Sequence, residues 1–120
     1  MAYYVDGFVI PVKKSKLAAY KKMARLGLKM WKKYGIVDYK ECILDDPKMG
    51  HGIIFPKLAR AKAGETVVFS FITYKSKAHR NQVNAKVMKD PAMANFDPTK
   101  GMPFDMKRMT MGGFKVMVSK

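Results

Sequence analysis

The hydrophobic pattern of the chain predicts a β-strand followed by a helix, twice. The first strand covers residues 3–12 and the second covers residues 66–74, and both carry apolar side chains at odd and even positions. Each is followed by the triplet Lys-Ser-Lys and then by apolar residues at helical spacing. A strand that is apolar on both sides is expected to be covered on both sides. The chain is therefore built from a β-α unit and its repeat.

The segment after the first strand predicts an amphipathic helix. We expect Ser15 to cap its first turn, because a serine hydroxyl accepts a hydrogen bond from an unpaired backbone N–H there, and Gly35 to end it. Apolar residues recur at three- and four-residue steps. This stripe comprises Leu17, Tyr20, Ala24, Leu28 and Trp31. The opposite side carries a basic surface, which comprises Lys22, Arg25, Lys29, Lys32 and Lys33.

The remaining segments complete one fold of the α+β class. A strand at residues 36–44 follows the first helix, and a glycine-rich excursion at residues 48–64 follows that strand. Ser76 caps the second helix, and the last strand is expected at residues 114–118. The order β-α-β, excursion, β-α-β predicts a ferredoxin-like βαββαβ fold with an antiparallel four-stranded sheet. A length of 120 residues fits a single domain that spans residues 1–120.

Two helices can cover only one face of such a sheet. The other face is nonetheless apolar, because Val67, Phe69 and Phe71 alternate along the strand at residues 66–74. A large exposed apolar face normally marks an association surface. We therefore expect a homodimer in which two copies pack sheet face against sheet face.

The net charge of +15 draws attention to the first helix. No acidic residue lies between Asp6 and Asp38, whereas nine lysine and arginine residues do. Such a cluster attracts phosphate polyanions through a screened field that is indifferent to sequence. The alternative is a solvated helix face without a partner.

Composition also bears on location. The single cysteine, Cys42, cannot form an internal disulfide. No apolar run approaches the roughly 18 residues that cross a bilayer, and no export signal precedes the first strand. We therefore expect a cytoplasmic protein that does not associate with a membrane.

Several blocks of the chain resemble the YbaA-like family of small bacterial proteins, over its whole length. They include residues 4–11 (YVDGFVIP), 65–70 (ETVVFS), 83–88 (VNAKVM), 102–105 (MPFD) and 112–114 (GGF). The resemblance implies a dimeric α/β-barrel. It implies no activity, since that family is a domain of unknown function, and the wider superfamily ranges from cofactor-free monooxygenases, haem-degrading enzymes and isomerases to proteins with no known reaction.

Polar residues on the buried strands are the candidates for chemistry. A buried carboxylate is costly unless it is paired. Asp6 and Glu41 are therefore each expected to have a partner such as Arg80 or Arg108, or to act as a general base with a raised pKa. His79 has the chemistry of a base or a metal ligand, and a structural role at the helix start is the alternative. The candidate ligand pocket comprises Asp6, Tyr39, Glu41, Ser70, His79 and Arg80.

No cofactor or metal is indicated. Haem-degrading relatives in the superfamily need an asparagine and a tryptophan on their strands, where this chain has Asp6 and Ser70. His51 and Cys42 do not make a zinc site, which takes four ligands. RNA-recognition modules place basic and aromatic residues together on the exposed sheet, whereas the basic residues of this chain crowd a helix.

Two functions are consistent with these observations. The first is a homodimer that binds a small organic molecule between sheet and loops, as a binding protein or as a cofactor-free enzyme. The second is a non-catalytic basic module that associates weakly with nucleic acid or acidic partners through the basic surface.

Overall fold

The computed structural model of the protein describes residues 2–93, 97 and 100–120. The strands are β1 (Tyr4–Lys13), β2 (Asp38–Ile43), β3 (Glu65–Tyr74) and β4 (Thr110–Lys115). The helices are α1 (Leu17–Lys33), α2 (Phe55–Leu58) and α3 (Lys77–Lys89), with short 3-10 turns η1 (Lys14–Lys16), η2 (Pro91–Met93) and η3 (Met106–Arg108). The strands form one antiparallel sheet in the order β2-β3-β1-β4. The predicted ferredoxin-like α+β fold is confirmed.

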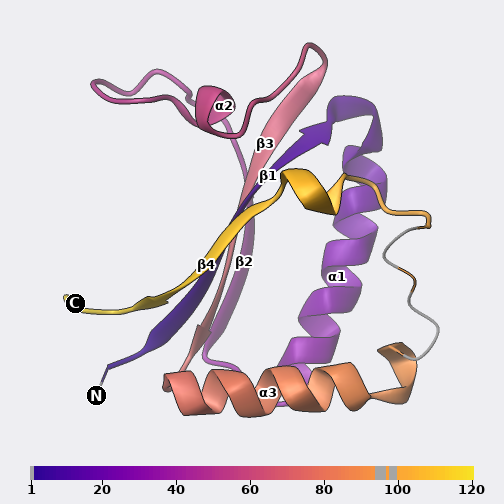
Figure 1. Ribbon diagram of the computed structural model, residues 1–120, viewed down its shortest axis with the longest axis vertical. Helices are drawn as coiled ribbons and strands as arrows, with labels where there is room; N and C mark the ends of the chain where they lie inside the picture. Colours follow the sequence, from indigo (N-terminus) through magenta and orange to yellow (C-terminus); the bar gives the residue numbers. More distant parts are fainter. Residues whose placement is uncertain (1, 94–96, 98–99) are drawn as a thin grey trace.

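The register of the sheet assigns each side chain to a face. Phe8 on β1 pairs with Ser70 on β3, and Ser70 pairs with Glu41 on β2. Directly paired residues project to the same face. Asp6, two residues before Phe8, shares that face because side chains alternate along a strand. Figure 1 shows α1 and α3 on this side of the sheet, which we call the helix face, and α2 on the other side, which we call the open face.

The helix face is closed by two buried clusters. One packs α1 against the sheet and comprises Ile10, Val12, Tyr20, Ala24 and Val68. The other packs α3 against the sheet and comprises Ile72, Tyr74, Val83 and Val87. Both clusters combine strand residues with helix residues. Each helix therefore turns its apolar side toward the sheet.

The open face is covered at one end only. Ala59, directly after α2, is buried against Val9 and Val67. The rings of Phe55 and Phe69 lie 6.3 Å apart. Phe69 remains 44% exposed despite this contact. Most of the predicted apolar face is therefore open in one copy of the chain.

Two local predictions were wrong. The last strand covers Thr110–Lys115 and not residues 114–118, because Gly112 and Gly113 belong to the ladder, where they pair with Gly7 and Asp6. Ser15 does not cap α1, because residues 14–16 form a 3-10 turn and the helix begins without a side-chain cap. By contrast, the predicted Ser76 cap of α3 is confirmed.

The buried side of α1 differs from the predicted stripe at one position. Leu28 is exposed, and the helix instead approaches the sheet at Gly27. A Cβ atom at Gly27 would lie 2.9 Å from the hydroxyl oxygen of Tyr39. The missing side chain therefore allows the helix and the tyrosine to meet.

Candidate functional site

The helix face buries one carboxylate beside one guanidinium group. Asp6 lies on β1 and is only 8% exposed, and Arg80, near the start of α3, places its Nε 3.7 Å from Asp6 Oδ1. Burial raises the pKa of Asp6, and the nearby charge of Arg80 offsets only part of that increase. Arg80 Nε is buried and has no hydrogen-bond partner within the described part of the chain. Because 3.7 Å is too long for a hydrogen bond, this pair leaves a buried donor unused.

Three further polar side chains surround this pair. The indole N–H of Trp31 donates to the Tyr74 hydroxyl at 3.1 Å and to Asn84 Oδ1 at 3.2 Å. The Tyr74 hydroxyl in turn donates to Asn84 Oδ1 at 3.2 Å. The polar groups of Asn84 and Tyr74 also lower the pKa of Asp6, but by less than burial raises it. We call these five residues the Asp6–Arg80 cluster.

The Tyr4 side chain lies against both Arg80 and β4 beside the cluster. Gly113 is the ladder partner of Asp6 on β4, and a Cβ atom there would clash with the hydroxyl of Tyr4. The Tyr4 hydroxyl accepts a hydrogen bond from Arg80 Nη2 at 3.3 Å, and its ring lies 5.0 Å from the guanidinium carbon. The side chains of Asp6 and Arg80 are 12% and 24% exposed.

A second polar group lies under α1. Glu41 on β2 accepts hydrogen bonds from the hydroxyls of Tyr20 at 2.7 Å and Tyr39 at 2.8 Å. Burial and the neighbouring Glu41 carboxylate raise the pKa of both tyrosines, so both remain donors at neutral pH. Glu41 is thus paired by tyrosines and not by the expected arginine, and Arg108 instead forms an ion pair with Glu65. Both oxygens of the Glu41 carboxylate are satisfied within the protein.

The other two predicted pocket residues lie between and beside these groups. Ser70 is buried in the sheet beside Glu41. His79 accepts a hydrogen bond from the backbone N–H of Lys75 at its Nδ1, and its own backbone N–H donates to Ser76 Oγ. The fold therefore joins Asp6 to Arg80 and Tyr39 to Glu41, while His79 holds the turn that starts α3.

Four polar members of these groups are not among the predicted pocket residues. Tyr20 and Trp31 are predicted as members of the apolar stripe of the helix, Tyr74 is predicted on one face of the strand at residues 66–74, and Asn84 is predicted to hydrogen-bond either a ligand or a neighbouring loop. A signal was present, because a tyrosine or tryptophan in a buried stripe needs a hydrogen-bond partner for its polar end.

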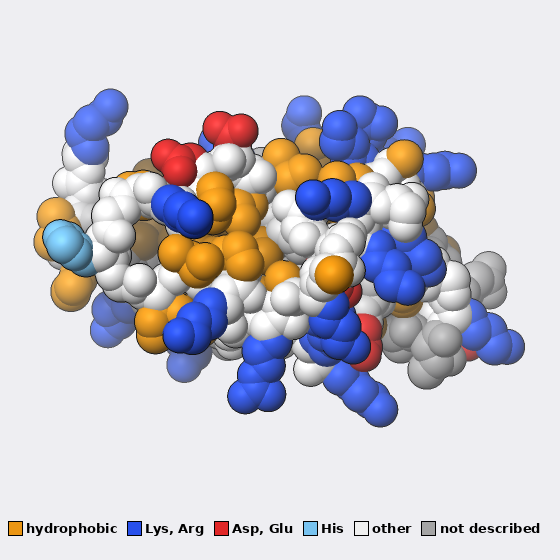
Figure 2. Space-filling view, turned by 90° about the horizontal axis from the view of Figure 1, so that it is seen from above, with side chains coloured by type: hydrophobic (Ala, Val, Ile, Leu, Met, Phe, Trp, Pro, Cys, Tyr) orange, Lys and Arg blue, Asp and Glu red, His pale blue; other side chains and the backbone are white. Residues whose placement is uncertain are grey.

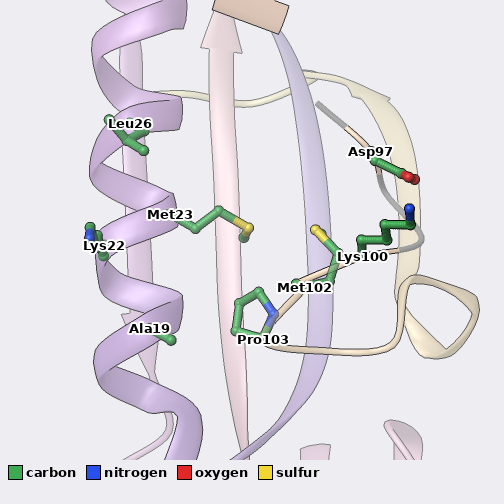
Figure 3. Close-up of a pocket in the computed structure, with 9 residues that line it drawn as sticks. Ala19, Lys22, Met23, Leu26, Asp97, Lys100, Met102 and Pro103 are labelled. Carbon is green, nitrogen blue, oxygen red and sulfur yellow. The ribbon is translucent and has the colours of Figure 1, made fainter. Parts of the chain in front are cut away.

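The basic surface of α1 lies outside both groups. Lys33 is paired with Asp90 at 2.8 Å. Across the described ranges, Lys22, Arg25, Lys29 and Lys32 are exposed and form no ion pair. A groove of about 560 Å³ separates this helix from residues 100–103. Figure 3 shows Met23 and Met102 pointing toward one another across it.

Within residues 2–93, 97 and 100–120, no three His, Cys, Asp or Glu side chains are grouped closely enough to hold a metal ion. In the same part of the chain, no helix has the length and apolar character needed to cross a bilayer.

The protein is therefore an α+β protein with a ferredoxin-like fold, which buries a polar cluster between its four-stranded sheet and its helices. The chain belongs to the family described as "Protein of unknown function (DUF1428)", whose profile matches residues 3–106. "Uncharacterized protein YbaA" of Escherichia coli (strain K12) is 40% identical over 117 residues, which is 98% of each chain. The YbaA protein of Shigella flexneri matches equally. The resemblance to the YbaA-like family is thus confirmed.

Solved structures with low sequence identity share the fold. A dimeric ferredoxin-like protein from an uncultured marine organism superposes with a TM-score of 0.59 at 13% identity, over 100% of both chains. A NIPSNAP family protein with unknown function from Agrobacterium tumefaciens superposes with a TM-score of 0.58 at 17% identity, over 95% of this chain and 87% of that one. At these identities the likeness concerns the fold alone.

Proposed function

We propose that the protein is a cytoplasmic homodimer that packs through its open faces, and that each copy binds a small organic molecule at the Asp6–Arg80 cluster without a cofactor. The proposed binding site rests on the buried Nε of Arg80, which has no hydrogen-bond partner in the described structure and lies beside the buried carboxyl group of Asp6. A bound molecule with an oxygen acceptor would satisfy this donor.

The chemistry of the cluster narrows the class of ligand. An arginine presents a planar set of donors that matches a carboxylate or a similar oxygen acceptor. A carboxyl group with a raised pKa, such as Asp6, exchanges a proton more readily near neutral pH than an exposed aspartate does. We therefore propose a small molecule with a carboxylate or carbonyl oxygen at Arg80 and an exchangeable proton at Asp6.

The shape of one copy supports the homodimer. Its accessible surface is 8917 Å², whereas a compact monomer of 13.6 kDa exposes about 6,600 Å². Its radius of gyration is 15.2 Å, against about 13.6 Å for a compact domain of this length. The excess surface matches the roughly 1,000–2,500 Å² that each partner buries in a permanent dimer. A flat chain with an uncovered apolar face is expected for one subunit of such a dimer, because the second subunit covers that face. The similar marine protein is itself described as dimeric.

Native mass spectrometry of protein purified from cells tests the binding site. We expect a mass of bound small molecule on the wild type and on Lys86→Gln, a control that removes an exposed cation from the same helix. Arg80→Gln should lose that mass while remaining folded. Retention of the same mass by folded Arg80→Gln would refute this site.

Light scattering tests the homodimer. Phe114 is 61% exposed on β4, so Phe114→Asp should leave each chain folded but shift the mass from two chains to one. Leu26→Asp on the outer side of α1 is the control, because Leu26 is equally exposed at 63% and should leave the dimer intact. A wild-type protein that is monomeric at micromolar concentration would contradict the proposal.

The basic surface supports a second candidate function, which is weak association with nucleic acid or acidic partners. The specific observation is that four of its cations are exposed on one helix without an ion pair among the described residues. Replacing Lys22, Arg25 and Lys29 with glutamine should change stability by less than about 0.5 kcal/mol. The affinity for a fluorescent single-stranded oligonucleotide should fall, and wild-type affinity should drop steeply between about 50 and 200 mM salt. Tight binding that persists in high salt would contradict this electrostatic view.

A further inference from the structure

The excursion between β2 and β3 presents an apolar ridge to solvent. It comprises Ile53, Ile54, Phe55 and Leu58, all of which are exposed. Figure 2 looks onto the molecule from the end where α2 lies and shows apolar side chains gathered there among lysine and arginine side chains. We call these four residues the α2 ridge. Within the described part of one copy they remain between 38% and 72% exposed.

The ridge occupies one end of the open face. It is anchored by the Phe55–Phe69 contact and by Ala59, which packs on Val9 and Val67. Val9 and Phe69 are ladder partners in the half of the sheet where β1 ends and β3 begins. The position of the ridge is therefore set by a packed contact with the sheet.

A second exposed apolar group lies at the opposite end of the same sheet. Phe114 on β4 pairs with Val5 near the start of β1, and its ring lies 3.4 Å from the Cβ position of Gly7. Met117 and Val118 follow directly and are 94% and 86% exposed. Figure 1 shows this terminal segment curving away from the helices. We call Phe114, Met117 and Val118 the distal patch.

The positions of these two groups restrict how two open faces can pack. Packed sheets lie about 10 Å apart, and a helix with its side chains is about 10 Å thick. If the two-fold axis ran along the strands, ridge would meet ridge, and two helical layers would hold the sheets apart at that end. If the axis runs across the strands, each end of the dimer contains one ridge, which fits the spacing.

We propose that the α2 ridge of each copy docks on the distal patch of a second copy of this chain. The inference rests on the proposed homodimer and specifies its arrangement. A two-fold axis makes the contact twice, because an isologous interface repeats each pair of contacts. The contact covers apolar side chains at both ends of the open face. The apolar area that it buries, together with the sheet-to-sheet contact, offsets the repulsion between two copies of charge +15.

Disulfide trapping between differently tagged copies tests this arrangement. Both copies carry Cys42→Ser, one carries Leu58→Cys and the other carries Met117→Cys. Both positions are exposed in one copy, so both variants are expected to fold. After mixing and mild oxidation, we expect a cross-linked product that contains both tags and has the mass of two chains on a denaturing gel. The matched control pairs Leu26→Cys, on the outer side of α1, with Met117→Cys and should give no such product.

The outcomes separate this inference from the homodimer itself. A dimer by light scattering that gives no cross-link between Leu58→Cys and Met117→Cys would overturn the docking of the ridge and leave the homodimer standing. Cross-links between two Leu58→Cys copies as the main product would also overturn it, because they place ridge against ridge. A monomer at all concentrations would overturn both proposals.

Discussion

Replacing Asp6 with asparagine is expected to stabilise the fold. The attraction between Asp6 and Arg80 at 3.7 Å amounts to about 4 kcal/mol at an effective dielectric constant of about 20. It is opposed by a desolvation cost of several kcal/mol for each buried ion. The pKa of Asp6 is raised, so desolvation outweighs the attraction. Asparagine keeps the shape without the charge, and we expect a gain of about 1 kcal/mol at about pH 7.

The pH dependence of this gain gives the prediction a distinctive signature. An acid whose pKa is raised by folding binds its proton more tightly in the folded state, so its contribution to stability is full below the unfolded-state pKa of about 3.9. That contribution is lost as the pH rises through the folded-state pKa. Asp6→Asn lacks this dependence. The stability difference between the variant and the wild type should therefore be smallest near about pH 3 and grow toward neutral pH.

Urea unfolding at several pH values measures this difference. Arg80→Met provides the opposite perturbation, because it leaves Asp6 buried without its cation and should cost about 2 kcal/mol at neutral pH. The double variant should recover most of that loss. If Asp6→Asn instead lowers stability by more than about 1 kcal/mol at neutral pH and this loss fades in acid, the pair is a stabilising structural ion pair and our reasoning about its function fails.

Two further predictions concern contacts outside this cluster. Arg108 donates to both Glu65 oxygens at 2.7 and 2.8 Å and to the Arg60 carbonyl, so Arg108→Lys, which cannot make a bidentate contact, should lower the free energy of unfolding by about 1–2 kcal/mol in urea. These bonds hold the pKa of Glu65 at about 2, below its unfolded value, so the loss should be full above about pH 5 and disappear in acid; a loss that is equal at low pH would refute this. Gly27→Ala should destabilise by about 1 kcal/mol despite better helix propensity, because its Cβ would press on the Tyr39 hydroxyl. In a Tyr39→Phe background the same change should become stabilising, and urea unfolding that shows no such reversal would exclude a steric cause.

Much of the architecture could be predicted because it depends on local pattern. The alternation in residues 66–74 and the three- and four-residue spacing in residues 17–31 are sufficient to identify a strand and a helix. The last strand was misplaced because Gly112 and Gly113, which read as a turn in isolation, are held in the ladder by pairing with Gly7 and Asp6. Ladder pairing joins residues far apart in the sequence, so local propensity does not report it.

The fold class, the apolar character of the open face and the basic surface of α1 could be predicted because each follows from the periodicity of one segment. Asp6 and Arg80 could also be named as candidates for chemistry from the sequence. Other features became visible only in the folded chain: Arg80 lies beside Asp6, and Glu41 is hydrogen-bonded by Tyr20 and Tyr39. The α2 ridge and the distal patch lie toward opposite ends of the sheet. Several side chains could pair with a given buried charge, because each would offset its desolvation. Strand register and helix packing, which join residues dozens of positions apart, determine which of them lies beside it.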